Sequence, residues 1–134
     1  MYIYNTKIRL FHTDAANLIF FSRIFDIAYE CYEEFLEKSD FGVKKIINDN
    51  NINMPVVHAE ADYIKPLRIG DKIEIRMSLN SSSKSSFILD FALFNESGEK
   101  AAKVKTVSVV IEAKSGKSIK IPEKLLKILN SLNF

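Results

Sequence analysis

The segment over residues 20–38 constrains the fold of this chain more than any other. Its apolar side chains recur at spacings of three and four, and its charged side chains fall mainly on the other faces, which is typical of an amphipathic helix. The apolar positions are Phe21, Ile24, Phe25, Ala28, Cys31, Tyr32 and Phe35. A stripe this broad and aromatic needs a large apolar surface to lie on, and a curved antiparallel sheet supplies one. We expect Ser22 to cap this helix and Cys31 to lie in the core.

Alternation of apolar and polar side chains predicts the strands of such a sheet. Residues 2–12 alternate in this way and predict a half-buried first strand. Further strands are expected after the helix, over residues 56–64, 72–79, 86–94 and 100–112. Two shorter helices are expected, one over residues 42–49 and one that opens at Pro122, while residues 48–53 are expected to form a loop. This order of elements is typical of an α+β protein with an antiparallel sheet, and not of a doubly wound parallel sheet.

Length and composition narrow the class of protein. The chain has 134 residues, enough for one hydrophobic core, so we expect a single domain over residues 1–134. Its formal net charge of +2 favours neither nucleic acid nor an anionic membrane as a partner. No apolar run approaches the roughly 20 residues that cross a bilayer, and the N-terminus lacks the order of a signal peptide. A single cysteine excludes an internal disulfide and a multi-cysteine metal site, so we expect a cytoplasmic protein with no bound metal.

Asp14 is the residue best placed for chemistry. It lies between the first strand and the long helix, with no basic residue beside it. A helix N-terminus offers free backbone N–H groups and positive partial charge, and a carboxylate offers a general base or a nucleophile. Asp14 is therefore a candidate catalytic group, although an acid that caps the helix or closes a turn also fits this position. His12 fits a structural position at the end of the first strand.

Two segments of the chain carry motifs. Residues 14–23 read D-A-A-N-L-I-F-F-S-R, and residues 63–71 read Y-I-K-P-L-R-I-G-D. They resemble the D-x-x-G-x-V-x-[YF]-x-[NS] and Y-x-x-P-x-x-x-G-D segments of the hot-dog-fold acyl-CoA thioesterases of the 4-hydroxybenzoyl-CoA thioesterase family. The family's glycine is replaced by Asn17, and asparagine tolerates a left-handed backbone better than most residues, so we expect the turn to persist.

With the order of elements, that resemblance covers almost the whole chain. It implies an α+β hot-dog fold in which a curved antiparallel sheet wraps one long helix. It also implies that two subunits join their sheets edge to edge, with active sites at the dimer interface, in a homodimer or homotetramer.

The same resemblance implies hydrolysis of an acyl-CoA. The family's acid corresponds to Asp14, as general base or nucleophile, and the backbone N–H that polarises the thioester carbonyl corresponds to Phe21. Residues 54–59, M-P-V-V-H-A, resemble a segment of 1,4-dihydroxy-2-naphthoyl-CoA hydrolases, which implies an aromatic acyl-CoA of phylloquinone or menaquinone biosynthesis as substrate. His58 is a candidate to hydrogen-bond an aromatic hydroxyl or orient water, or is a solvated side chain on a polar strand face. Glu30 is a reserve acid, because some related enzymes use a helix glutamate.

Coenzyme A enters as part of such a substrate, so no separate cofactor is expected. Its phosphates need cations, and the chain has neither a P-loop nor a G-x-G-x-x-G segment, so we expect them to bind at the surface. The basic-serine cluster that the family often places against the nucleotide corresponds to Lys84, Ser85 and Ser86, although Lys84 also fits an ordinary turn. Lys65 and Arg68 are further candidates.

Two other functions stay open on the sequence. One is a broad short- or medium-chain acyl-CoA thioesterase, and the other is a non-catalytic acyl-CoA-binding module, since a fold does not fix a function. Asp14 separates catalysis from binding, because catalysis requires the acid and binding alone does not.

Overall fold

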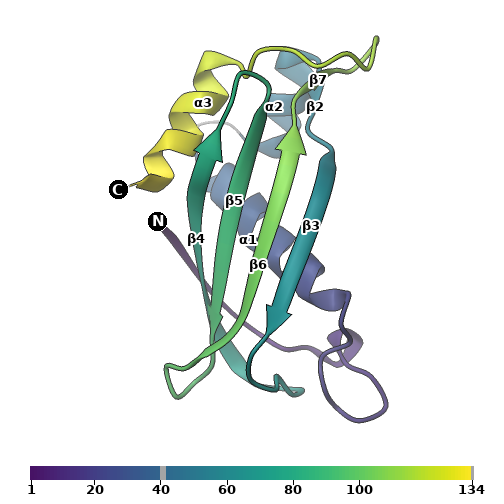
Figure 1. The fold of residues 1–134 in the computed structure, drawn as a ribbon, viewed down its shortest axis with the longest axis vertical. Helices are drawn as coiled ribbons and strands as arrows, with labels where there is room; N and C mark the ends of the chain where they lie inside the picture. Colours follow the sequence, from purple (N-terminus) through teal and green to yellow (C-terminus); the bar gives the residue numbers. More distant parts are fainter. Residues whose placement is uncertain (40–41, 134) are drawn as a thin grey trace.

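A five-stranded antiparallel sheet and one long helix make up most of the structure, a computed structural model that describes residues 1–39 and 42–133 (Figure 1). The strands stand in the order β1-β4-β5-β6-β3. Their bounds are β1 Tyr2–Lys7, β3 Val56–Tyr63, β4 Lys72–Ser82, β5 Ser86–Phe94 and β6 Lys100–Val109. The long helix α1 (Arg23–Lys38) crosses one face of the sheet, and α2 (Val43–Asn50) and α3 (Glu123–Asn130) lie toward its upper end (Figure 1). The predicted α+β architecture is confirmed. Within residues 1–39 and 42–133, no helix is long and apolar enough to cross a membrane.

The core lies between α1 and the inner face of the sheet. Buried side chains alternate with more exposed ones along β4 and β5, so one face of each strand is closed against the helix. The buried residues of α1 are Ile24, Ile27, Ala28, Cys31, Tyr32, Phe35 and Leu36. Each large apolar side chain buried here contributes about 1.5–3 kcal/mol relative to an exposed one. The apolar side chains of α1 therefore fix the helix across the sheet. Burial, with a smaller effect of the Glu30 charge, raises the pKa of the Cys31 thiol to about 12.

The first strand and the long helix are both shorter than predicted. β1 ends at Lys7, and Leu10–His12 form a 3-10 turn rather than the end of a strand. α1 begins at Arg23 rather than at residue 20, because the Arg23 N–H donates to the Phe20 carbonyl at 2.9 Å and closes a separate turn ahead of the helix. Ser22 occupies the N-cap position, but it has helical backbone angles and makes no side-chain capping bond, so the predicted cap is wrong.

A two-stranded ribbon lies outside the main sheet. β2 (Ile52–Asn53) pairs with β7 (Ile111–Glu112), so the loop predicted over residues 48–53 contains a short strand. The strand predicted over residues 100–112 is divided at Val110, whose N–H donates to a carbonyl in the turn between β4 and β5 at 2.8 Å. The pairing of β2 with β7 joins segments far apart in the sequence, which local alternation cannot reveal.

β3 is an edge strand that is exposed on both faces. It pairs with β6, and no other described strand pairs with its outer edge. Every residue of β3 is exposed except the half-buried Ala61, whereas β5, in the middle of the sheet, has none that is fully exposed. A strand edge of this kind offers unpaired N–H and C=O groups to a second chain.

Candidate active site

Asp14 lies in a tight chain reversal that we call the Asp14 loop, residues 13–20. Thr13 and Ile19 pair across its base, and the Asp14 N–H donates to the Leu18 carbonyl at 2.9 Å. The carboxylate is exposed, and its Oδ1 accepts the Ala16 N–H at 2.8 Å and the Leu18 N–H at 3.4 Å. Among the hydrogen bonds of the described residues, none involves Oδ2. The loop therefore orients the carboxylate through one oxygen and leaves the other accessible.

Asn17 gives this loop its turn. Its φ of 64° lies in the left-handed region, which the family's glycine adopts without strain and which asparagine tolerates. The Asn17 N–H donates to the Asp14 carbonyl at 3.0 Å. The turn expected at this position is present despite the missing glycine.

The two sequence motifs contact each other directly. We call residues 63–71 the Pro66 turn. The Ile19 N–H donates to the Leu67 carbonyl at 2.9 Å, and the Ile69 N–H donates to the Asn17 carbonyl at 3.1 Å. Leu18 and Arg68 form an antiparallel bridge between these two bonds. Segments more than 40 residues apart in the chain thus form one hydrogen-bonded unit beside the start of α1.

The backbone at Phe21 has a free donor. The Phe20 N–H donates to the His12 carbonyl at 2.8 Å, and the Phe20 carbonyl accepts the Arg23 N–H. No hydrogen bond between described residues uses the Phe21 N–H, so it is available to a ligand oxygen. The Tyr63 hydroxyl donates to the Phe21 carbonyl. Phe21 was predicted to lie inside the helix, but it lies two residues ahead of the start of α1.

His12 is structural. Its side chain is only 3% exposed, and its Nδ1 accepts the Arg9 N–H at 2.9 Å. Burial lowers the pKa of the imidazole, against opposing effects of the Glu30 and Asp26 charges. A neutral ring with an unprotonated Nδ1 can accept this bond. The buried His12 side chain therefore fixes the backbone just before the Asp14 loop.

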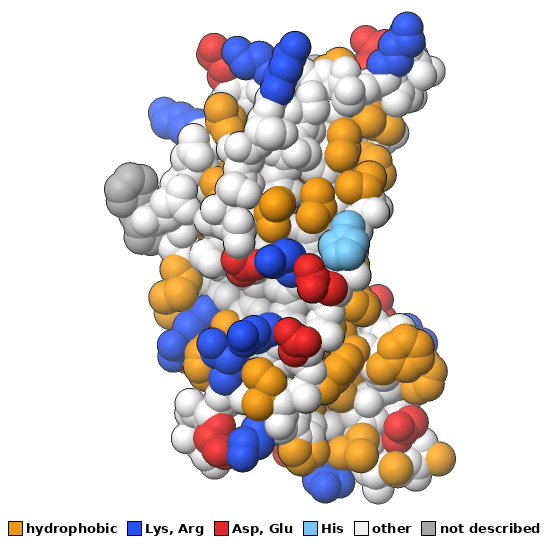
Figure 2. Space-filling model, in the orientation of Figure 1, with side chains coloured by type: hydrophobic (Ala, Val, Ile, Leu, Met, Phe, Trp, Pro, Cys, Tyr) orange, Lys and Arg blue, Asp and Glu red, His pale blue; other side chains and the backbone are white. Residues whose placement is uncertain are grey.

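A small hollow and several exposed apolar side chains surround this unit. The hollow, of about 240 Å³, is lined by Leu18, Ile19, Tyr63, Ile64, Lys65, Pro66 and Leu67. Exposed apolar side chains nearby in the chain are Leu10, Phe11, Phe20, Phe21 and Ile69. Figure 2 shows a gathering of apolar side chains at the lower right, where Figure 1 places the loop ahead of α1. Larger hollows lie elsewhere, including one of about 450 Å³ on the outer face of the sheet, but their described linings include neither Asp14 nor Phe21.

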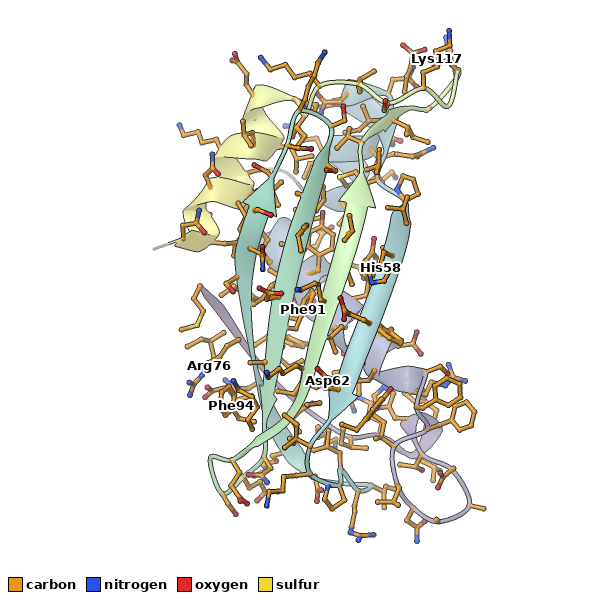
Figure 3. All side chains as sticks on the ribbon, viewed as in Figure 1. His58, Asp62, Arg76, Phe91, Phe94 and Lys117 are labelled. Atoms are coloured by element: carbon orange, nitrogen blue, oxygen red, sulfur yellow. The ribbon has the colours of Figure 1, made fainter. Side chains whose placement is uncertain are left out.

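His58 is not part of this unit within one chain. It lies on the upper half of β3, and its Nε2 is 3.4 Å from Glu60 Oε1 at an exposed position (Figure 3). Tyr63, which contacts Phe21, is five residues further along the strand, or roughly 16 Å at the usual rise per residue. Any role of His58 beside Asp14 requires a second chain.

The predicted phosphate ligands fall at opposite ends of the sheet. Lys65 and Arg68 belong to the Pro66 turn, where Lys65 Nζ is 3.5 Å from Glu99 Oε2. The other group occupies the turn between β4 and β5 at the upper end (Figure 1). There the Lys84 and Ser85 carbonyls accept backbone N–H groups, and Ser86 Oγ is 2.6 Å from Ser83 Oγ. β5 alone spans roughly 30 Å between the two ends, so one chain does not bring both groups to one ligand.

The reserve acid, Glu30, faces the first strand and His12. Glu30 is half-buried on α1 and contacts the Tyr4 hydroxyl of β1, whose pKa is raised by burial and then by the Glu30 charge. In the part of the chain that the structure describes, no three His, Cys, Asp or Glu side chains are grouped as a metal site would require.

The chain as a whole is similar to known proteins in sequence and in fold. Residues 8–129 match the thioesterase-like superfamily. A Gloeothece citriformis protein named 1,4-dihydroxy-2-naphthoyl-CoA hydrolase is 34% identical over 135 residues, covering 99% of this chain and 94% of the relative. A Prochlorococcus marinus protein of the same name is 38% identical over 111 residues, covering 76% of this chain and 71% of its own. The crystal structure of a 1,4-dihydroxy-2-naphthoyl-CoA thioesterase from Synechocystis has the same fold, with a TM-score of 0.90 at 24% identity over 99% of this chain and 98% of that one.

Proposed function

The chain belongs to the thioesterase-like superfamily, and we propose that it hydrolyses the thioester bond of an aromatic acyl-CoA at the Asp14 loop. The observation that carries this proposal is the hydrogen-bonded unit of the two motifs. It presents the accessible Asp14 carboxylate on the loop that leads to Phe21, and no described residue accepts the Phe21 N–H. Relatives that match nearly the whole chain are named as hydrolases of such a thioester, which supports the same reaction.

The proposed chemistry follows from these two groups. The Phe21 N–H donates to the thioester oxygen as negative charge develops there, a contribution of a few kcal/mol for one well-placed donor. Asp14 takes a proton from water while the water oxygen bonds to the carbonyl carbon, and the C–S bond then breaks as protonated Asp14 returns the proton to the leaving sulfur. The products are the carboxylic acid and the thiol of coenzyme A. Direct attack by the Asp14 carboxylate gives the same products through a mixed anhydride that water then hydrolyses.

We propose 1,4-dihydroxy-2-naphthoyl-CoA as the substrate. The names of the relatives support this choice. So do the exposed rings at the loop, because Phe20 and Phe21 lie with their centroids 4.9 Å apart and offer apolar faces to a planar acyl group. We place the reaction in the cytoplasm, as the sequence predicts.

The proposed enzyme is a homodimer joined through β3, or a homotetramer made of two such dimers. The outer edge of β3 has no strand partner among the described residues, and antiparallel pairing with a second copy satisfies it. Such pairing reverses the ends of the sheet, so the turn with Lys84 in one subunit reaches the same end as Lys65 and Arg68 in the other. It also brings His58 of the partner subunit opposite the lower half of β3. A dimer therefore reunites site residues that one chain holds apart.

Release of thiol from a panel of acyl-CoAs tests the proposed function. The panel holds 1,4-dihydroxy-2-naphthoyl, benzoyl, short-chain and medium-chain thioesters at equal concentrations. We expect the naphthoyl thioester to give the highest kcat/KM. A preference for short or medium chains would establish the broad thioesterase instead. Tight binding of the thioesters without release of thiol would establish the non-catalytic binding module.

A further inference from the structure

The start of α1 lacks the side-chain cap that usually fixes a helix N-terminus. Ser22, at the N-cap, makes no capping bond, and caps of this kind are worth about 1 kcal/mol. Part of the backbone around Phe21 is nevertheless engaged, since the Phe20 N–H and the Phe20 carbonyl both have backbone partners. No hydrogen bond of the described residues uses the Phe21 N–H or the Ser22 N–H. The Phe21 carbonyl is held differently, because its partner is the Tyr63 hydroxyl.

Tyr63 is a firm anchor for that bond. It ends β3 opposite Ala102 of β6, and the next two residues both donate their N–H groups to the Ala101 carbonyl, at 2.9 and 3.0 Å. Ala101 and Ala102 are fully buried. The backbone of Tyr63 is thus fixed by the sheet, while the segment that its hydroxyl contacts belongs to an uncapped helix start. Burial raises the pKa of Tyr63 above its ordinary value, so the phenol stays a protonated donor at neutral pH.

We infer that Tyr63 is a positioning residue, whose hydroxyl holds the Phe21–Ser22 peptide. This bond limits rotation of the adjoining Phe20–Phe21 peptide, whose carbonyl accepts the Arg23 N–H, so that the Phe21 N–H points at the thioester oxygen. The inference rests on the proposed function and adds a residue to it. His12 fixes the backbone just ahead of Phe21, and Tyr63 fixes it just behind. Between these two bonds lies the Phe21 N–H, which no hydrogen bond of the described residues uses. A shift of about 1 Å in such a donor costs a catalyst much more than the hydrogen bond that prevents the shift.

The test compares Tyr63→Phe with Tyr29→Phe. Tyr29 is exposed to a similar extent, at 40% against 48% for Tyr63, and no described hydrogen bond uses its hydroxyl. Because phenylalanine keeps the ring, both variants should fold, and circular dichroism with thermal unfolding checks this. We expect Tyr63→Phe to lower kcat about 10-fold with KM changed less than about twofold. We expect Tyr29→Phe to match the wild type.

A second readout does not depend on turnover. In an acyl-CoA analogue whose thioester sulfur is replaced by a methylene group, the ketone cannot be hydrolysed, and its infrared carbonyl stretch reports polarisation in the bound state. The stretch should shift to lower frequency on binding to wild type and to Tyr29→Phe, and should return toward the free value in Tyr63→Phe. An unchanged kcat and an unchanged stretch in Tyr63→Phe, with an active wild type, would overturn this inference alone. A wild type that releases no thiol would overturn the proposed function and the inference with it.

Discussion

The middle of α1 and its start are held in opposite ways. In the middle, side chains such as Ile27 and Cys31 are fully buried against the sheet, and many apolar contacts of this kind together hold the helix in place. At the start, Phe21 is 65% exposed, and individual hydrogen bonds to His12 and Tyr63 set the path of the backbone. The difference indicates that the middle of the helix contributes most to stability, and the proposed function assigns the chemistry to the start of the helix. Changes in the two regions should therefore separate folding from activity.

The largest expected effect on stability comes from the packed region. Phe87 is fully buried, with its ring centroid 6.3 Å from that of Tyr32 on α1. Phe87→Ala should lower the free energy of unfolding by about 3–5 kcal/mol, through lost burial and a cavity. Urea unfolding measures this, and the rate per folded molecule should stay near that of the wild type.

Phe20→Ala is the matched change at the start of the helix. Phe20 is 44% exposed, so its loss should change the free energy of unfolding by less than about 1 kcal/mol while reducing kcat/KM for the aromatic thioester. Equal losses of stability from Phe87→Ala and Phe20→Ala would contradict the proposed difference between the packed region and the start of the helix.

A smaller effect on stability is expected at Asn17. Asn17 and Asn51 are the non-glycine residues described with positive φ, at 64° and 52°. Alanine pays about 1–2 kcal/mol in this conformation relative to residues that tolerate it, so Asn17→Ala and Asn51→Ala should lose similar stability. Only Asn17→Ala should also lower kcat, since Asn51 ends α2 away from the Asp14 loop.

Asn17→Gly tests whether the turn or the asparagine side chain matters to the site. Glycine adopts a positive φ without strain, so the variant should keep its kcat. A fall in kcat as large as that of Asn17→Ala would show that the asparagine side chain, and not the turn, matters to the site.

The smallest expected effect is a pH dependence of stability from His12. Burial lowers its pKa in the folded state, so below the ordinary histidine value of about 6.5 the unfolded chain binds more protons than the folded one. The contribution of His12 to stability is therefore complete above that value and is lost as pH falls through the lowered pKa. Urea unfolding of wild type and His12→Asn over this range should show a smaller decrease in the variant.

Local patterns in the sequence were sufficient to predict the main elements. The spacing of apolar residues predicted α1, and alternation predicted the strands of the main sheet, because both patterns report which face of an element is buried. The tolerance of asparagine for a left-handed backbone predicted the turn at Asn17. The two motifs resembled those of one family, and the superfamily match over residues 8–129 confirms it.

Features that depend on contacts between distant segments were not predicted. The alternation of residues 2–12 continues past Lys7, yet the chain leaves the strand there to bury His12. The bond from Tyr63 to Phe21 has no signal in periodicity, although Tyr63 is the first residue of the second motif. The separation of Lys84 from Lys65 likewise follows from the topology of the sheet and not from spacing in the chain.

The most direct test of a catalytic role for Asp14 is to compare thiol release by Asp14→Asn with thiol release by Asp26→Asn. Both acids are exposed near the start of α1, but the Asp26 carboxylate forms a surface ion pair with Arg23 at 3.1 Å. Asp14→Asn should lower kcat by about 100-fold or more, with the fold retained, and Asp26→Asn should stay within about twofold of the wild type. Full turnover in Asp14→Asn would contradict the account, reduce Asp14 to an acid that closes a turn, and move the search for the catalytic group to Glu30 and His58.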